Sequence, residues 1–284
     1  MSILAISGRK GHGKDVVGKI IQYLTSESYK KGRDYETFIR KQTSNLDFEP
    51  HYISKWQIKK FADKLKDIIC LLIGCSRDQL ENESFKSKEL GEEWWYWYME
   101  LDGGYSPIIL DYLTTTKKEL KSYEGLELIK PTARFLLQFI GTNLFRNQLH
   151  PEIWVNALMN EYKPLYGYQT TDSKITIGDI SIPILGLDID KRIFPNWIIT
   201  DMRFPNEMEA VKKRGGITIR VNRPCDTCGG SGYHKMSCPV SKSGEHYSET
   251  ALDSAEFDYV VDNNSDIQSL IEKIKQVLIR EKLL

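Results

Sequence analysis

Residues 8–15 read Gly8-Arg9-Lys10-Gly11-His12-Gly13-Lys14-Asp15, a glycine-rich segment that ends in a lysine and an aspartate. The segment follows the apolar run Ile3-Leu4-Ala5-Ile6 and precedes apolar residues at helical spacing, which are Val16, Val17, Ile20, Ile21 and Leu24. Glycines allow backbone N–H groups to converge on an anion, and the N-terminus of the next helix adds a favourable positive potential. The segment therefore predicts a strand, a phosphate-binding loop and a helix, in that order.

The lysine of this loop indicates which anion it binds. In loops of the G-x4-G-K type the lysine reaches the β- and γ-phosphates of a nucleotide, so we expect this chain to bind a nucleoside triphosphate. The alternative is a glycine turn that joins strand to helix without a ligand. The motif usually continues with serine or threonine as a magnesium ligand, and a carboxylate at Asp15 is also a hard oxygen ligand for Mg²⁺. The predicted triphosphate contacts are Gly8, Lys10, Gly11, His12, Gly13, Lys14 and Asp15.

The composition argues against several classes of partner. Lysine plus arginine number 39, as do aspartate plus glutamate, so no bulk charge favours nucleic acid or a membrane surface. No apolar run approaches the roughly 18–20 residues of a transmembrane helix, and the first residues form a core strand rather than a signal peptide. Five cysteines, two of them in a Cys-x2-Cys pair, suit a reducing compartment. We therefore expect a cytoplasmic protein.

Strand-like and helical segments alternate along the chain. After a polar stretch at 26–57, expected to be a helix end and a loop, helical patterns begin near Phe61 and again after Pro131. Alternating residues at 163–194 predict a β-hairpin insertion. Further strands are expected near residues 197, 217 and 260, followed by a closing helix over 266–282. The pattern predicts a three-layer α/β fold with a mostly parallel central sheet.

A second polar cluster is expected at the same rim of the sheet as the loop. Asp201 and Arg203 directly follow the strand at Trp197, and ligands of open α/β sheets bind beyond the carboxyl ends of the strands. Asp201 is placed to hold Mg²⁺ through water or to activate an attacking oxygen, and Arg203 to clamp a phosphate. Both are candidate catalytic residues together with Lys14 and Asp15. The alternative is an Asp–Arg pair that caps the next helix.

Two further features have both a functional and a structural interpretation. Polar residues recur at four-residue steps at Arg134, Gln138, Thr142 and Arg146, without any acid, which favours contact with an anionic ligand over a solvated helical face. The aromatic segment at 92–98 favours packing at a lobe or subunit interface over stacking on a base, and suggests a homodimer.

In order and spacing, the chain resembles the bacteriophage deoxynucleoside monophosphate kinase family, a group of P-loop nucleotide kinases. The matching segments cover most of the length, but neither the hairpin at 163–194 nor the aromatic segment. They are Gly8 to Asp15, Phe61 to Lys66, Arg134-x3-Gln138-x2-Gly141-Thr142-x3-Arg146 with Trp154, Asp201-x-Arg203-Phe204-Pro205-Asn206-Glu207, His246-x-Ser248-Glu249, and Phe257-Asp258-Tyr259.

The resemblance implies ATP-dependent phosphorylation of deoxynucleoside 5′-monophosphates to diphosphates. Lys14 and the loop amides would hold the ATP phosphates, with Asp15 at the magnesium. Arg220 and Arg223 would contact the substrate and flank a lid at 223–247 that excludes water during transfer. Phosphoryl transfer needs positioning and cations around the phosphate oxygens. On the monophosphate side the resemblance places Lys66, Arg134, Gln138, Arg146 and Arg203.

The same resemblance implies one kinase domain over 1–284 with a helical monophosphate-binding region at 58–160. Its partners would be the small molecules ATP and a deoxynucleoside monophosphate, with neither membrane nor nucleic acid, in the host cytoplasm if the protein is viral. Two other functions stay open. One is a kinase of another small phosphorylated acceptor. The other is a zinc-knuckle nucleic-acid-binding ATPase, against which the neutral charge counts and which a gel-shift assay at physiological salt would detect.

Within the predicted lid, Cys225, Cys228, His234 and Cys238 form the pattern C-x2-C-x5-H-x3-C. Four such ligands within a short loop suit a tetrahedral structural Zn²⁺ that is closed to solvent. Glycines between the ligands allow the tight turns that wrapping a metal requires. The alternatives are a flexible loop of reduced thiols, and His246 as the fourth ligand.

We predict that the purified protein carries close to one zinc per chain. Ligand thiols must ionise to bind, so zinc affinity falls as the pH drops, and chelation loosens the lid without unfolding the sheet. Elemental analysis after expression in zinc-supplemented medium measures the stoichiometry. Metal-free protein with full activity would make the cysteines incidental, and a Cys228→Ser variant that keeps its zinc would show that other ligands bind the metal.

Overall fold

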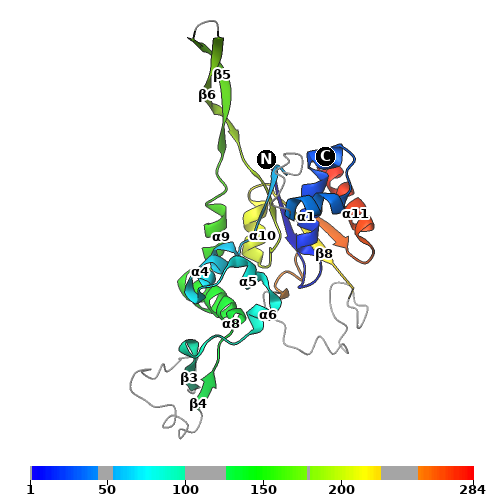
Figure 1. Ribbon diagram of the computed structural model, residues 1–284. Coiled ribbons are helices and arrows are strands. Elements are labelled where there is room, and N and C mark those ends of the chain that lie inside the picture. The colour runs from blue at the N-terminus through cyan, green and yellow to red at the C-terminus, as the bar shows by residue number, and fades with distance from the viewer. Residues whose placement is uncertain (1, 44–53, 100–125, 178–179, 225–248) are drawn as a thin grey trace. The chain divides into compact units, whose positions relative to one another are not determined.

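The computed structural model describes residues 2–43, 54–99, 126–177, 180–224 and 249–284 (Figure 1). The chain forms two compact units. The first unit combines Met1–Phe61 with Val155–Leu284, and the second is Ala62–Trp154.

The first unit is built on a five-stranded sheet in the order β2-β7-β1-β8-β9. All four strand pairs are parallel, and Ile3 of β1 lies opposite Trp197 of β7 while Leu4 lies opposite Ile217 of β8. The predicted parallel sheet is therefore confirmed. The strands are β1 (Ile3–Ser7), β2 (Trp56–Lys59), β7 (Asn196–Ile199), β8 (Ile217–Asn222) and β9 (Tyr259–Asp262).

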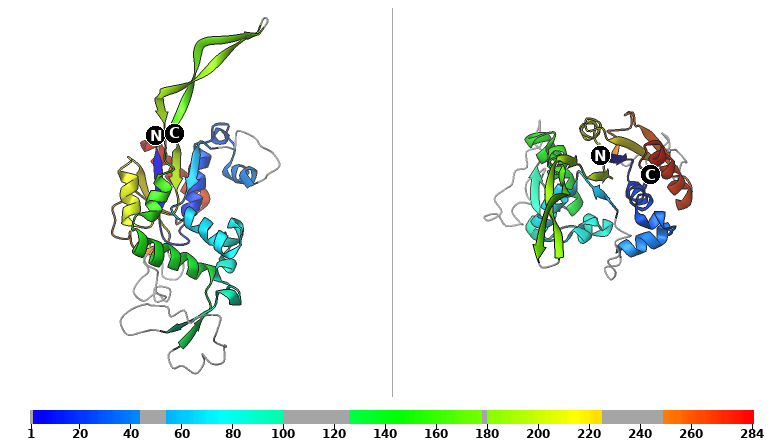
Figure 2. Two further views of the ribbon diagram at one scale, coloured as in Figure 1. Left: turned by 90° about the vertical axis from the view of Figure 1, so that its left-hand side faces the viewer. Right: turned by 90° about the horizontal axis from the view of Figure 1, so that it is seen from above.

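Helices cover both faces of this sheet, so the predicted three layers are present. Leu4 and Ile6 of β1 pack in one core with α1 (Lys14–Leu24) and α11 (Ile267–Arg280). Ile3 and Ala5 point the other way and pack with residues of α9 (Ile153–Met159) and α10 (Pro205–Lys212). Figure 2 shows α1 and α11 together beside the sheet, with α10 on the opposite face. All of β1 is buried because it is the central strand.

Helix α1 lies close against β7, and its sequence allows this. A Cβ atom at Gly18 would lie 2.7 Å from Cγ2 of Thr200, the residue that follows β7. A larger side chain there would push the helix off the strand. The glycine therefore fixes the height of α1, and of the loop before it, above the sheet.

The stretch at 26–57 contains more structure than the sequence predicts. Two short helices, α2 (Glu27–Lys30) and α3 (Tyr35–Thr43), lie in it, and β2 forms one edge of the sheet. Strand β2 has only four residues, of which only Trp56 is fully buried. So short an edge strand has almost no apolar pattern of its own, and its pairing with β7 defines it.

The second unit is a small helical assembly. Its core consists of Leu65, Ile69, Leu80, Ala133, Leu136 and Trp154. The helix predicted after Pro131 begins as α8 and continues as a π-helix, η3, so the four-residue stripe spans two helix types. The helices are α4 (Asp63–Ile73), α5 (Arg77–Glu81), α6 (Glu83–Ser87), α8 (Ala133–Gln138) and η3 (Phe139–Leu149).

The aromatic segment packs within this second unit. It contains the 3-10 turn η2 (Glu92–Trp94) and strand β3 (Tyr96–Met99), which pairs antiparallel with β4 (Leu126–Ile129). Trp95 Nε1 donates to the Leu90 carbonyl at 3.0 Å, and the Lys130 ammonium lies 4.4 Å from the Trp95 ring centre. These contacts give the segment an intramolecular role, and the homodimer stays a prediction.

The predicted hairpin is confirmed. Strands β5 (Leu165–Ile177) and β6 (Ile180–Ile193) pair antiparallel inside the expected range 163–194. Within the described ranges, none of the helices combines the length and apolar character that crossing a membrane requires.

Candidate functional site

The glycine-rich loop has the backbone that its sequence predicts. Gly13 caps α1 with a φ of 94°, in the left-handed region that favours glycine, and a Cβ there would lie 2.7 Å from Asn263 Nδ2. A Cβ at Gly8 would lie 2.5 Å from the Val221 carbonyl oxygen. Asn263 also donates to the His12 carbonyl at 3.0 Å. The loop therefore packs tightly against the ends of β8 and β9 before it enters the N-terminus of α1.

Lys14 lies inside this loop. Its Nζ donates to the carbonyl of Gly8 at 2.6 Å and to that of Arg9 at 2.9 Å. Burial and the charge of Arg203 lower the pKa of Lys14 to about 8, against the opposing effects of Glu249 and nearby aspartates. At neutral pH the side chain is still mainly an ammonium, held where the loop backbone converges.

Asp15 presents an ionised carboxylate next to Lys14. Its Oδ1 accepts from the Thr200 hydroxyl at 2.7 Å and lies 2.9 Å from the Lys60 ammonium. Burial acts to raise the pKa of Asp15, but the Lys60 charge and the hydrogen bonds from Lys60 and Thr200 outweigh it, so the pKa is lowered. Much of the carboxylate is exposed, so it offers hard oxygen atoms suited to Mg²⁺, while the buried Thr200 hydroxyl orients it. Neither Lys60 nor Thr200 belongs to a sequence motif that predicts its place at this site.

Asp201 lies at the end of β7, on the rim that the sequence predicts. It is 8% exposed, and its Oδ1 accepts the Phe61 backbone N–H at 2.8 Å. It is also near enough to Lys14 to raise the lysine's pKa. Helix α10 obtains its cap from a different residue, because Glu207 accepts the backbone N–H groups of Arg203 and Phe204.

His12 is the loop's imidazole. Its Nδ1 donates to the Val221 carbonyl at 3.1 Å, which fixes the tautomer. Burial is the largest cause that lowers its pKa, and the charges of Lys14, Arg220 and Arg9 act in the same direction. The ring is therefore neutral at physiological pH and adds no charge to the loop.

Two carboxylates of the turn at 249–254 contact cations around the loop. Glu249 Oε1 lies 2.5 Å from Arg203 Nη1, and its Oε2 accepts the Lys10 backbone N–H at 2.8 Å. Asp253 contacts Arg9 and Arg220, each at 2.6 Å. The resemblance included Glu249 without giving it a role, and no motif near Asp253 marks that residue. The sequence does not predict their contacts with the loop, because these span 239 and 244 residues.

The two arginines predicted beside the lid have different surroundings. Arg220 belongs to β8, is only 7% exposed, and donates to the Ser7 hydroxyl at 3.3 Å. Its guanidinium also lies 5.7 Å from the Phe257 ring centre. Arg223 follows β8 and is exposed. Arg220 is thus part of the packed network under the loop, and its contact with substrate stays a prediction.

Four of the five predicted monophosphate residues, Lys66, Arg134, Gln138 and Arg146, lie in the second unit, whereas Arg203 lies in the first. Lys66 pairs with Glu81 and Arg134 with Glu83, both at 2.5 Å, while Gln138 is exposed. Arg146 lies half-buried in η3. The stripe itself contains no acid, as its sequence shows, but neighbouring helices supply acids to two of the four predicted residues.

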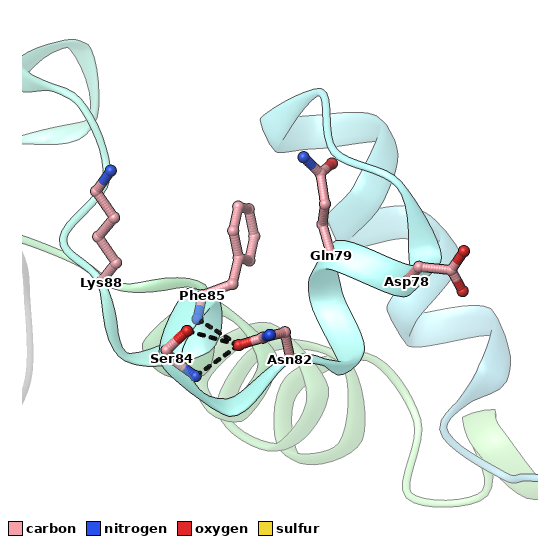
Figure 3. A pocket seen from close by; sticks show the side chains of 6 residues that line it. All are labelled: Asp78, Gln79, Asn82, Ser84, Phe85 and Lys88. Atoms are coloured by element: carbon pink, nitrogen blue, oxygen red, sulfur yellow. Dashed lines mark hydrogen bonds between the residues drawn. The ribbon is translucent and has the colours of Figure 1, made fainter.

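A hollow of about 660 Å³ opens between α5 and α6. Figure 3 shows the Phe85 ring and the Gln79 amide on its walls, and Asn82 Oδ1 accepting from the backbone N–H groups of Ser84 and Phe85. The remaining lining residues are Asp78 and Lys88. None of the residues selected from the sequence lines this hollow.

The predicted zinc ligands Cys225, Cys228, His234 and Cys238, and the rival His246, lie outside the described residues, as does most of the lid at 223–247. Among the residues that are described, no group of three or more His, Cys, Asp or Glu side chains is arranged to hold a metal ion. Magnesium in phosphate sites usually takes one or two carboxylates and completes its shell with phosphate and water oxygens. Asp15 alone can therefore serve as the protein's ligand.

Comparison with known proteins gives one limited match. No family model matches the chain. The chain is similar to a protein of Acanthamoeba polyphaga mimivirus that is named provisionally as a deoxynucleotide monophosphate kinase, with 26% identity over 144 residues. The match covers 50% of this chain and 59% of that protein. The likeness supports a nucleotide kinase family and leaves the substrate open.

We predict that Lys14 titrates near pH 8, because its burial and Arg203 both disfavour the ammonium. NMR of isotopically labelled lysine side chains, assigned with Lys14→Arg, measures this pKa. Arg203→Ala is expected to raise it and Glu249→Gln to lower it, because these partners act with opposite sign. A titration near the ordinary 10.5 would show that the ammonium is solvated rather than held inside the loop.

Proposed function

We propose that this protein is a kinase that transfers the γ-phosphoryl group of ATP to a deoxynucleoside 5′-monophosphate. The observation that supports the proposal is the loop itself, in which left-handed glycines, a half-buried Lys14 and the start of α1 lie together in the arrangement that binds an anion. Asp15, oriented by the Thr200 hydroxyl, adds carboxylate oxygen atoms beside it. A site of this kind suits a polyphosphate much better than a neutral ligand.

Each loop residue has a role in such a transfer. The loop N–H groups and Lys14 orient the triphosphate and balance charge that develops between the β- and γ-phosphates. Asp15, kept ionised by Lys60 and oriented by Thr200, would hold Mg²⁺. The metal, when bound, would shield phosphate charge and help to align the groups. Arg203, whose charge already lowers the pKa of Lys14, would clamp a phosphate near the lysine.

Lys66, Arg134 and Arg146 are proposed to bind the acceptor monophosphate. Lys66 and Arg134 are held by Glu81 and Glu83 in this structure, in contacts that are partly exposed. Exposed ion pairs contribute little stability, so a dianionic phosphate can compete with these carboxylates at small cost. The acids would then keep the two side chains extended between catalytic cycles.

The mimivirus relative supports the deoxynucleoside monophosphate acceptor, although at 26% identity the acceptor and the bacteriophage lineage both remain proposals. A structural zinc within 225–238 is also proposed, on the spacing of its cysteines and histidine. Four protein ligands would leave that zinc no open position, so it would take no part in the transfer.

The function is tested by coupled ADP release with MgATP and each of the four deoxynucleoside monophosphates, with ribonucleotides in parallel. We expect release that depends on at least one deoxynucleoside monophosphate. Activity only with another phosphorylated acceptor would move the protein to that kinase class. ATP turnover that needs nucleic acid and no monophosphate would contradict the proposal.

We predict that Lys14→Ala lowers the rate of transfer by about 10²–10³-fold, the usual effect of removing one such electrostatic contact. The fold should stay intact, because the ammonium donates to the loop carbonyls of Gly8 and Arg9 rather than to the core of the sheet. Steady-state kinetics and circular dichroism measure the two effects. Lys19→Ala, on the exposed side of the same helix, is the matched control and should behave as wild type. Near-normal turnover of Lys14→Ala would remove this lysine from the mechanism.

We predict that Arg134→Ala and Arg146→Ala each raise the KM for the monophosphate more than the KM for ATP, since arginine–phosphate contacts are lost outright on truncation. Lys130→Ala is the control, because Lys130 lies in the same unit with a similar 39% exposure and has no predicted role at the phosphates. It should leave both KM values unchanged. A selective rise in the KM for ATP would assign the two arginines to the other substrate.

A further inference from the structure

Glu249 joins the phosphate loop to the end of β7. One oxygen accepts the Lys10 backbone N–H at 2.8 Å and the other lies 2.5 Å from Arg203 Nη1. The carboxylate is 19% exposed, while the arginine side chain is 39% exposed. A single carboxylate therefore holds both a backbone amide of the loop and the Arg203 guanidinium, whose positive charge acts on Lys14.

The turn that carries Glu249 is anchored independently of any ligand. Leu252, three residues on, is 2% exposed and packs in the core beside Met202 and Ala5. Backbone bonds from Asp253 to Thr250 at 2.9 Å and from Ala255 to Leu252 at 3.2 Å close the turn. The carboxylate is thus presented to Arg203 from a rigid base.

Arg203 is fixed at two points as a result. Its backbone N–H donates to Glu207 at 2.7 Å, and its guanidinium meets Glu249. A guanidinium is a planar fork with five donors, so it can contact a carboxylate along one edge and a phosphate along another. An arginine held in this way need not be ordered again each time a phosphate arrives, and such preorganisation is a main source of rate in phosphoryl transfer.

We propose that Glu249 is a positioning residue for the transfer: it orients the Arg203 guanidinium toward the phosphate site and ties it to the loop through the Lys10 amide. This inference rests on the proposed function. The opposite arrangement, in which Glu249 competes with phosphate for Arg203, would require the carboxylate to leave an anchored turn. The packing of Leu252 argues against it.

The test is a double-mutant cycle in the full-length protein with Glu249→Gln and Arg203→Ala. Glu249→Gln keeps the shape but loses the charge, and we expect kcat to fall on the order of 10- to 100-fold, with a change in the KM for ATP of about twofold or less. In the Arg203→Ala background the same substitution should have a much smaller effect, because most of it acts through that arginine and only the direct effect on Lys14 and the Lys10 amide remains. Glu249→Asp should recover part of kcat.

Glu256→Gln is the matched control, since it removes the same charge from an exposed position seven residues further along the chain. It should leave kcat unchanged. Equal losses from Glu249→Gln with and without Arg203 would overturn the inference, because the two residues would then act separately. Tighter ATP binding with faster turnover in Glu249→Gln would also overturn it, because the Glu249 carboxylate would then compete with phosphate for Arg203.

A second measurement does not depend on turnover. NMR relaxation of the Arg203 guanidinium should show a rigid side chain in the wild type and a mobile one in Glu249→Gln. A guanidinium equally rigid in both proteins would refute the positioning role. The protein could also lack kinase activity while its guanidinium is rigid in the wild type and mobile in Glu249→Gln. That result would refute the proposed function but confirm that Glu249 orients Arg203.

Discussion

Positive charge concentrated around one short loop is the constraint on which the rest of this site depends. Lys14, Arg9, Arg203 and Arg220 gather there, and Lys14 is buried enough for its pKa to fall to about 8. Such cations repel each other and tolerate burial only with compensation. The loop's own Asp15 and three carboxylates from distant parts of the chain supply it: Asp201, Glu249 and Asp253. The arrangement keeps the cations in place while leaving them able to bind an anion.

The parts of the fold that the sequence predicts are those with a strong local pattern. The β1–loop–α1 unit, the strand before Asp201 and the closing helix α11 all combine apolar periodicity with a clear start or end. Strand β2 does not, because four residues at a sheet edge show too little periodicity. The π-helical turn of η3 likewise has no pattern that distinguishes it from an ordinary helix.

The residues of the candidate site likewise divide into those that the sequence predicts and those that it does not. Lys14 and Asp15 follow from the loop motif, and Asp201 and Arg203 from their place after β7. The partners that tune them do not, since Lys60, Thr200, Glu249 and Asp253 reach the loop only through tertiary contacts. In the second unit, the acid-free stripe predicted an anion site, whereas Glu83, which pairs with Arg134 of the stripe, comes from another helix. Sequence spacing identifies residues on one element, and only the fold brings their counter-charges to them.

The strand order has a consequence for how this protein is made. Strand β1 ends at Ser7, but its neighbours β7 and β8 begin at Asn196 and Ile217, so the ribosome must synthesise most of the chain before the central strand has a partner. Until then an apolar segment with unpaired backbone groups is exposed to other chains. Folding through such distant contacts is intrinsically slow, and the nascent chain therefore depends on protection from aggregation while it waits for its own later residues.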